Sequence, residues 1–307
     1  MQVESSLPGV RALGAIPAHF RALALSSAVM LWLIVASGAT VRLTASGLGC
    51  EHWPGCQPGQ VFPEKGYHSF VEFSNRMVAA ATICVTLVAW LGARRAPGLP
   101  RWASRLALFT FVGTLAQAPL GAITVASHLN PKIVLSHLLL SIVVLGAGVV
   151  VAIEALRLGD PREPYVPMVV RRIGLVLAAA CFVLVVSGTF VTAAGPHPGS
   201  KAVRRLGSFQ PAVEAHVRAT AVFGIAFALL LAYLFAQRRR WPGIFNAALA
   251  VLAVLVAQMA VGEIQYRTQL PWWLVLVHVT LAAAVWAVVV AFVTLLWRPV
   301  RALRVLD

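Results

Sequence analysis

Residues 271–297 read PWWLVLVHVTLAAAVWAVVVAFVTLLW, a run without a single Asp, Glu, Lys or Arg. A helix that crosses a bilayer needs about 20 mostly apolar residues, and this run is long enough to do so. Seven other runs along the chain have the same character. We therefore predict an all-α polytopic membrane protein with eight transmembrane helices, at 23–44, 70–93, 104–126, 131–155, 170–192, 212–236, 243–264 and 271–297.

The composition agrees with this prediction. The chain has 307 residues, of which 60% are hydrophobic and only 11% are charged. A soluble domain of this size does not need so apolar a surface, whereas the lipid-facing side of a transmembrane helix does. The run at 23–44 follows a mixed segment that lacks a clear small-residue cleavage site, so we expect a retained helix and not a signal peptide.

The basic residues are unevenly distributed. The formal net charge of +15 would suit a nucleic-acid-binding protein, but 16 of the 25 Lys and Arg residues fall at one set of helix ends, together with both termini. An excess of Lys and Arg marks the cytoplasmic side of a membrane protein. We expect both termini to be cytoplasmic, with membrane lipids and not nucleic acid as the partner of this charge.

An internal repeat divides the chain into two halves. The segment QAPLGAI at 117–123 recurs as QMAVGEI at 258–264, an offset of 141 residues. The same offset relates His137 to His278 and Asn75 to His216. Each half contains an even number of spans, so the two four-helix bundles should be parallel repeats related by an axis along the membrane normal.

This repeat sets the expected domain organisation. The expected parts are a cytoplasmic N-terminal segment (1–22), an N-terminal four-helix half (23–155), a cytoplasmic linker (156–169), a C-terminal four-helix half (170–297) and a cytoplasmic tail (298–307).

The repeated polar positions lie at one depth. Asn75, His137, His216 and His278 each lie a few residues into a span that enters from the outer face, roughly 7–11 Å below the helix end at the usual rise per residue. A lone histidine in a span is usually a hydrogen-bonded interior residue. A matched pair is more specific: zinc usually takes three or four protein ligands, whereas His216 and His278 alone suit the axial positions of a haem. In the other half His137 faces Asn75, a poor iron ligand.

Three charged residues lie near this level. Glu72 is one helical turn before Asn75 and is either an interface residue or a proton-handling group. Arg42 and Arg76 lie near outer helix ends. They either anchor the helices at the interface or pair with haem propionates, which arginine does in bidentate fashion.

The four cysteines fall into two classes. Cys84 and Cys181 lie inside spans and are expected to be small buried residues. Cys50 and Cys56 flank a Pro-Gly turn in the first outer loop, where oxidation is permitted. They predict a disulfide or a redox-active dithiol, with a Cys/His metal site that includes His52 as the alternative.

Two of these motifs resemble a known family. GATVRLTASGLGC at 38–50, followed by Trp53-Pro54 and Cys56, resembles the first-span and outer-loop signature of the haem A synthase family. VEFSNR at 71–76 is similar to its second-span glutamate motif. The resemblance covers nearly the whole chain, and the first-loop motif is the specific one.

The resemblance implies a haem-dependent oxidoreductase of two four-helix halves. Such an enzyme oxidises a porphyrin methyl group of haem O to formyl by successive hydroxylations, giving haem A for terminal oxidases. It implies haem b between His216 and His278, substrate haem near His137, Glu72 as the catalytic residue and Cys50 with Cys56 as the outer-loop pair. It also implies a prokaryotic cell membrane, and haem O synthase and cytochrome oxidase assembly factors as partners. The chain departs from the family at Asn75, where the usual residue is histidine.

Two other function classes use the same residues. A membrane b-type cytochrome that acts only in electron transfer would need the histidines but neither Glu72 nor the cysteine pair. A transporter built on parallel repeats would use the histidines for substrate or protons. A homo-oligomer is compatible with the sequence in each case.

Overall fold

The computed structural model describes residues 8–50, 52–53, 55–59, 61–63, 66–159, 166–200 and 205–300, with side chains from His19 onward. Within these ranges the elements are α1 (Pro8–Leu43), α2 (Tyr67–Arg95), α3 (Arg101–Ala126), α4 (Pro131–Arg157), α5 (Met168–Ala194), α6 (Phe209–Ala236), α7 (Pro242–Arg267) and α8 (Trp272–Trp297). All eight are long and apolar enough to cross a membrane. The predicted all-α fold with eight transmembrane helices is confirmed.

The helices extend beyond several of the predicted spans. The helix α1 begins at Pro8, so the boundary expected at residue 22 falls inside it, and the apolar part of α1 is His19–Leu43. At the other end of the chain, α7 continues past 264 to Arg267, where Arg267 pairs with Glu263 one turn earlier at 2.5 Å. Hydropathy marks only the part of a helix in the hydrocarbon, whereas the backbone hydrogen bonds continue into the polar interface.

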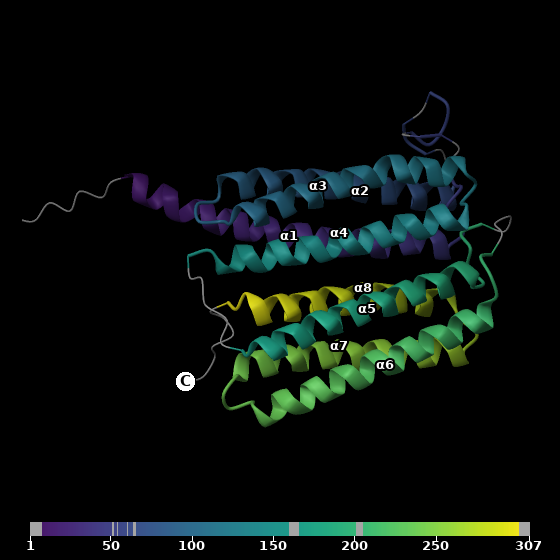
Figure 1. The fold of residues 1–307 in the computed structure, drawn as a ribbon. Helices are drawn as coiled ribbons and strands as arrows, with labels where there is room; N and C mark the ends of the chain where they lie inside the picture. The colour runs from purple at the N-terminus through teal and green to yellow at the C-terminus, as the bar shows by residue number, and fades with distance from the viewer. Residues whose placement is uncertain are drawn as a thin grey trace, which may run out of the picture.

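Figure 1 shows α1–α4 together on one side of the molecule and α5–α8 together on the other. The helices α4 and α8 lie between the two groups. In their most apolar stretches 61% and 39% of the residues are buried, against 22% in each of the other six helices. The α1–α2, α3–α4, α5–α6 and α7–α8 connections share one end of the bundle, which we call the connection end; we call the opposite end the terminal end. That the two groups are related by an axis along the membrane normal stays a prediction.

Two tryptophans join the groups along a contact that we call the seam, formed by α1 and α4 on one side and α8 on the other. The indole N–H of Trp32 donates to the carbonyl oxygen of Thr280 at 3.0 Å, and that of Trp286 donates to the carbonyl oxygen of Ile142 at 2.8 Å. Gly146 lets the helices approach, because a Cβ there would lie 3.0 Å from the Trp286 indole nitrogen. Small residues of this kind allow close helix packing in membranes.

The backbone carries the sequence repeat in one further place. Residues with positive φ end α3 and α7 in the same way: His128 and Leu129 at 50° and 60°, Gln269 and Leu270 at 64° and 58°. The two turns are again 141 residues apart (269 − 128). Such φ values are uncommon outside glycine, so their recurrence shows that the α3–α4 and α7–α8 connections share one local conformation.

Candidate functional site

The first connection is closed by the predicted disulfide. Cys50 and Cys56 are bonded to each other, are 1% and 0% exposed, and pack against Phe73 of α2. No cluster of three or more potential metal-ligating side chains occurs in the part of the chain that the structure describes, so the Cys/His metal alternative has no support there. Of the other two cysteines, Cys181 is buried as expected, but Cys84 is exposed and that expectation is wrong.

Glu72 is directly attached to this disulfide loop. Glu72 belongs to α2 and is only 4% exposed. One oxygen accepts the backbone N–H of Cys50 at 2.9 Å, and the other accepts Nη2 of Arg76 at 2.6 Å. The i,i+4 spacing brings Glu72 and Arg76 onto one face of the helix.

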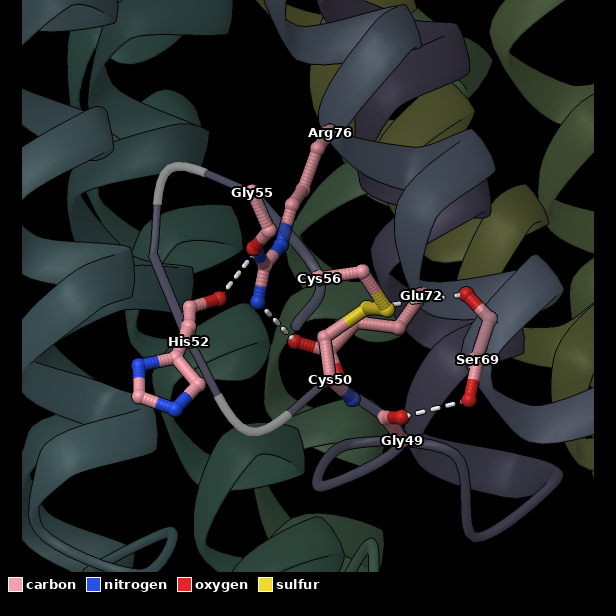
Figure 2. Close-up of a disulfide and its surroundings, with 8 residues drawn as sticks. All are labelled: Gly49, Cys50, His52, Gly55, Cys56, Ser69, Glu72 and Arg76. Atoms are coloured by element: carbon pink, nitrogen blue, oxygen red, sulfur yellow. Dashed lines mark hydrogen bonds and ion pairs between the residues drawn. A yellow bond between two sulfur atoms is a disulfide. The ribbon is translucent and has the colours of Figure 1, made fainter. Parts of the chain in front are cut away.

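Arg76 also holds the loop itself. Its Nη1 donates to the carbonyl oxygen of His52 at 2.7 Å and to that of Gly55 (Figure 2). The prediction that Arg76 pairs with a propionate stays a prediction; in this structure its guanidinium bridges the Glu72 carboxylate and two loop carbonyls.

Further contacts fix the loop against the start of α2. Ser69 donates its hydroxyl to the carbonyl oxygen of Gly49 at 2.6 Å (Figure 2). A Cβ at Gly49 would lie 2.5 Å from the backbone of His68, so only glycine fits there. The loop that carries the disulfide is therefore docked on α2 on both sides of Cys50.

The imidazole of His216, on α6, is oriented by α5. The Ser187 hydroxyl donates to the carbonyl oxygen of Leu184 at 2.7 Å and lies 2.8 Å from Nδ1 of His216. When Ser187 gives its one proton to Leu184, it accepts the proton of Nδ1. The lone pair of His216 is then on Nε2, the arrangement that metal-binding histidines usually have.

His278, on α8, is the expected partner of His216. The two imidazoles are close enough to interact electrostatically. The Gln258 amide nitrogen lies 3.1 Å from Nε2 of His278, and Nδ1 is buried without a hydrogen-bond partner. For Nε2 to bind a metal, the Gln258 amide must turn away.

The first group of helices places His137 and Asn75 differently. Nδ1 of His137 and Oδ1 of Asn75 are both buried without a hydrogen-bond partner. Gln117, the counterpart of Gln258 in the repeat, donates to the carbonyl oxygen of His137 at 3.3 Å and to Ser141 Oγ at 2.8 Å. Two buried polar atoms without partners need an explanation, and a polar ligand between α2 and α4 would provide one.

A glycine on the preceding helix lies against each of the three histidines. An added Cβ would lie 3.6 Å from His137 Cε1 at Gly121, 3.1 Å from His216 Cε1 at Gly188, and 3.0 Å from His278 Cε1 at Gly262. The fourth helix pair, α1 and α2, has the glycine without the histidine: a Cβ at Gly38 would meet nothing within 4 Å.

Arg42 links the two groups at the connection end. Its Nε donates to the carbonyl oxygen of His197 at 2.9 Å, and its Nη2 donates to that of Thr192 at the end of α5. Its predicted pairing with a propionate is untested by these contacts, and in this structure Arg42 ties the end of α1 to the second group.

Sequence reasoning missed Ser187 and Gly188. They lie in VVSGTFV at 185–191, which matches VASGATV at 35–41 with an offset of 150 residues (185 − 35). The offset differs from 141 because the α1–α2 connection (44–66) is longer than the α5–α6 connection (195–208). A search that allowed the offset to change between helix pairs would have found Ser187, Gly188 and Gly38 together.

Known proteins support the assignment of this chain to a family. It is 32% identical over 128 residues to a haem A synthase of Shewanella oneidensis, covering 36% of this chain and 38% of that protein. It is 29% identical over 309 residues to a protohaem IX farnesyltransferase of Thermus thermophilus, covering 91% of this chain and 49% of that protein. It is 24% identical over 289 residues to a haem A synthase of Geobacillus kaustophilus, covering 89% and 90%.

The first of these matches spans less than half the length of the relative. The family model is more extensive: residues 21–290 match the model described as cytochrome oxidase assembly protein. Since this range covers most of the chain and at least part of each of the eight apolar helices, the chain belongs to the cytochrome oxidase assembly protein family.

Proposed function

We propose that this protein is a haem A synthase, an oxidoreductase that converts a methyl group of haem O into the formyl group of haem A. The observation that carries the proposal is the His216–His278 pair, in which Ser187 leaves Nε2 of His216 free. The haem A synthases among its relatives support it, above all the Geobacillus protein that aligns along most of both chains.

The residues of the second group fit a resident haem b. His216 and His278 would hold its iron, the glycines 188 and 262 leave room for the two rings, and Nδ1 of His278 lacks a partner. When bound, this haem supplies one-electron redox chemistry. The remaining roles belong to the protein: Ser187 fixes a tautomer, and the apolar helices exclude water.

The first group of helices is the proposed site of haem O. His137 is the protein's candidate ligand, because it is the repeat partner of His278. The buried oxygen of Asn75 belongs to α2, and the open space beside Gly38 adjoins α1. The substrate would therefore have one imidazole ligand and one less occupied side, which suits a molecule that must enter and leave.

Glu72 is the proposed proton acceptor. Oxidation of a methyl group to a formyl group releases protons as well as electrons, so a base is needed near the reacting edge. Glu72 is a buried carboxylate on α2, the helix that also carries Asn75.

Conversion of haem O tests the proposal. The protein is expressed in a host that supplies haem O and lacks its own haem A synthase, and the extracted haems are separated by chromatography. Haem A is expected from the wild type and not from Glu72→Gln. The exposed carboxylate Glu214, at the same end of α6, provides the matched control Glu214→Gln, which should form haem A normally.

Spectra separate this proposal from a b-type cytochrome. His216→Ala and His278→Ala should each abolish the low-spin haem b signal, while Glu72→Gln should keep it. A wild-type protein with a normal haem b spectrum that forms no haem A from supplied haem O would favour pure electron transfer instead.

A haem O synthase is the proposed partner. The Thermus relative is named a protohaem IX farnesyltransferase, the activity that makes haem O. This chain matches only about half of that relative, so the relative joins a region similar to this chain to additional sequence. Co-purification of this protein with the host's haem O synthase from mildly solubilised membranes is the test. Impermeant maleimide labelling of cysteines placed near each end would test the proposed cytoplasmic location of both termini.

A further inference from the structure

The disulfide loop and the proposed catalytic carboxylate share one set of contacts. Cys50, one partner of the disulfide, donates its own backbone N–H to Glu72. Arg76 donates to Glu72 and to two carbonyls of the residues between the cysteines, His52 and Gly55 (Figure 2). The disulfide also packs against Phe73 of the same helix.

We propose that Arg76 is a positioning residue, and that through it the Cys50–Cys56 bond and the Glu72 carboxylate are energetically coupled. With the disulfide formed, the loop holds Glu72 in place; with the disulfide reduced, this hold is lost. The catalytic consequence rests on the proposed function, but the coupling itself does not.

The geometry of arginine suits this task. The guanidinium is planar, permanently charged and has several donors in a fixed fork. In Arg76 this fork reaches a carboxylate on one side and two carbonyl oxygens on the other, with the side chains of Arg76 and Glu72 12% and 6% exposed. If Arg76 were removed, Glu72 would be a buried charge without its cation, which is strongly unfavourable. Lysine at position 76 could pair with Glu72 but could not span all three acceptors.

Because the disulfide closes the loop covalently, it keeps the loop carbonyls of His52 and Gly55 within reach of Arg76. Reduction by an external dithiol at the connection end breaks the sulfur–sulfur bond, passes both electrons and both protons of the dithiol to Cys50 and Cys56, and leaves the dithiol oxidised to its own disulfide. The loop can then rearrange, and the N–H of Cys50 and the carbonyls of His52 and Gly55 are no longer held against α2.

Coupling of this kind is reciprocal. If the disulfide stabilises the Glu72–Arg76 arrangement, then that arrangement must stabilise the disulfide by the same free energy. Variants that remove Arg76 or the charge of Glu72 should therefore make the Cys50–Cys56 bond easier to reduce, with no haem substrate present.

The experiment measures this equilibrium directly. Full-length protein with its haem b, in detergent, is equilibrated with mixtures of reduced and oxidised dithiothreitol, the thiols are trapped by alkylation, and the Cys50–Cys56 peptide is quantified by mass spectrometry. Peptide analysis distinguishes this pair from the free Cys84 and Cys181. Hydrogen bonds to charged groups contribute about 1.5–3 kcal/mol each. Every 1.4 kcal/mol is tenfold in an equilibrium constant. Half of the disulfide in Arg76→Ala and in Glu72→Gln should therefore be reduced at a ratio of reduced to oxidised dithiothreitol that is lower than in the wild type by a factor of about ten or more.

Two further variants make the result specific. Arg76→Lys should lie between the wild type and Arg76→Ala, and it serves as the test if Arg76→Ala does not fold, as judged by size-exclusion chromatography in detergent. Arg218→Ala is the matched control, because Arg218 pairs with Glu214 at the same i,i+4 spacing but with both side chains exposed and no loop attached. Its disulfide should behave as in the wild type.

The outcomes separate this inference from the proposed function. A reduction midpoint of Arg76→Ala, or of Arg76→Lys if only that variant folds, that lies within twofold of the wild type overturns the coupling. If the midpoints shift as expected but the wild type forms no haem A, the coupling holds and the proposed function fails.

Discussion

Arg298 binds Glu154 through two parallel hydrogen bonds, from Nε to Oε1 at 2.6 Å and from Nη2 to Oε2 at 2.8 Å. Glu154 is 2% exposed and belongs to α4, whereas Arg298 directly follows α8. Arg157, one turn after Glu154, contacts the same carboxylate at 3.3 Å and donates to the carbonyl oxygen of Pro299 at 3.2 Å. The two groups of helices are thus joined at the terminal end by a buried ionic cluster.

Removal of Arg298 should lower stability. Leaving a buried charge without any partner costs about 3–5 kcal/mol; because Arg157 still contacts the Glu154 carboxylate, the loss in Arg298→Ala should be smaller than this. We expect Arg298→Ala to lower the melting temperature of the detergent-solubilised protein, measured by tryptophan fluorescence. Arg239→Ala, at an exposed arginine of the same end, is the control and should melt like the wild type. The double variant Glu154→Gln/Arg298→Ala should lose less stability than the sum of the losses in the two single variants; strictly additive losses would mean that Glu154 and Arg298 are not coupled.

Alanine at two glycines should displace the haem ligands. A Cβ at Gly188 or Gly262 would lie about 3 Å from an imidazole carbon of His216 or His278. Each ring would have to shift by a few tenths of an ångström, and we expect haem b affinity to fall by roughly 10–100-fold, as for other disturbed supports of metal ligands. Haem titration followed by absorption spectroscopy measures the effect.

The first group of helices provides the control for this prediction. Gly38→Ala makes the same chemical change where nothing lies within 4 Å, so it should leave haem b affinity and protein yield unchanged. A loss of haem b in Gly38→Ala as large as in Gly188→Ala would mean that the effect comes from helix packing and not from the ligands.

Loss of the Ser187 hydroxyl should weaken haem b binding through the tautomer of His216. Without this acceptor, Nδ1–H of His216 loses its hydrogen bond to the Ser187 oxygen, and the ring can place its proton on Nε2 instead. Ser187→Ala should reduce haem affinity by about tenfold or more, with a change in the low-spin spectrum. Ser37→Ala, at the matching position of α1, should bind haem b as the wild type does; wild-type affinity in Ser187→Ala would show that Ser187 does not set the tautomer.

Histidine should be tolerated at position 75. The space beside Gly38 is the counterpart of the space that Gly188 leaves for His216, so Asn75→His should fold normally and add a low-spin component when haem O is supplied. Filling that space in the double variant Asn75→His/Gly38→Val should remove the component. If Asn75→His adds no low-spin signal, then α2 does not face the substrate as the repeat predicts.

The number and the type of the helices could be predicted from the sequence because lipid contact demands apolar residues along the whole length of a span. The ends could not, because interfacial residues such as Glu263 and Arg267 continue a helix without being apolar. The start of α1 at Pro8 was missed for the same reason.

The site was predictable where the repeat conserves a residue type. His137 and His278 were predicted in this way, and His216 was predicted as the counterpart of Asn75. Their role as iron ligands stays a prediction. The contacts of Arg42 and Arg76 could not be foreseen, because their acceptors are backbone carbonyls, which every residue has. The Glu154–Arg298 pair joins residues 144 positions apart, and neither residue belongs to the repeat.

The central position of α8 has a consequence for biogenesis. Translation delivers α1 and α4 to the membrane well before Trp272–Trp297 leaves the ribosome, so Trp32 and the carbonyl of Ile142 must wait for their partners on α8. Until α8 is made, the surface of the N-terminal helices that will contact it has no protein partner. The N-terminal group therefore cannot complete its folding before the C-terminal group is synthesised. A chain that terminates before α8 would leave that surface permanently without its partner, and we expect membrane proteases to degrade such a chain.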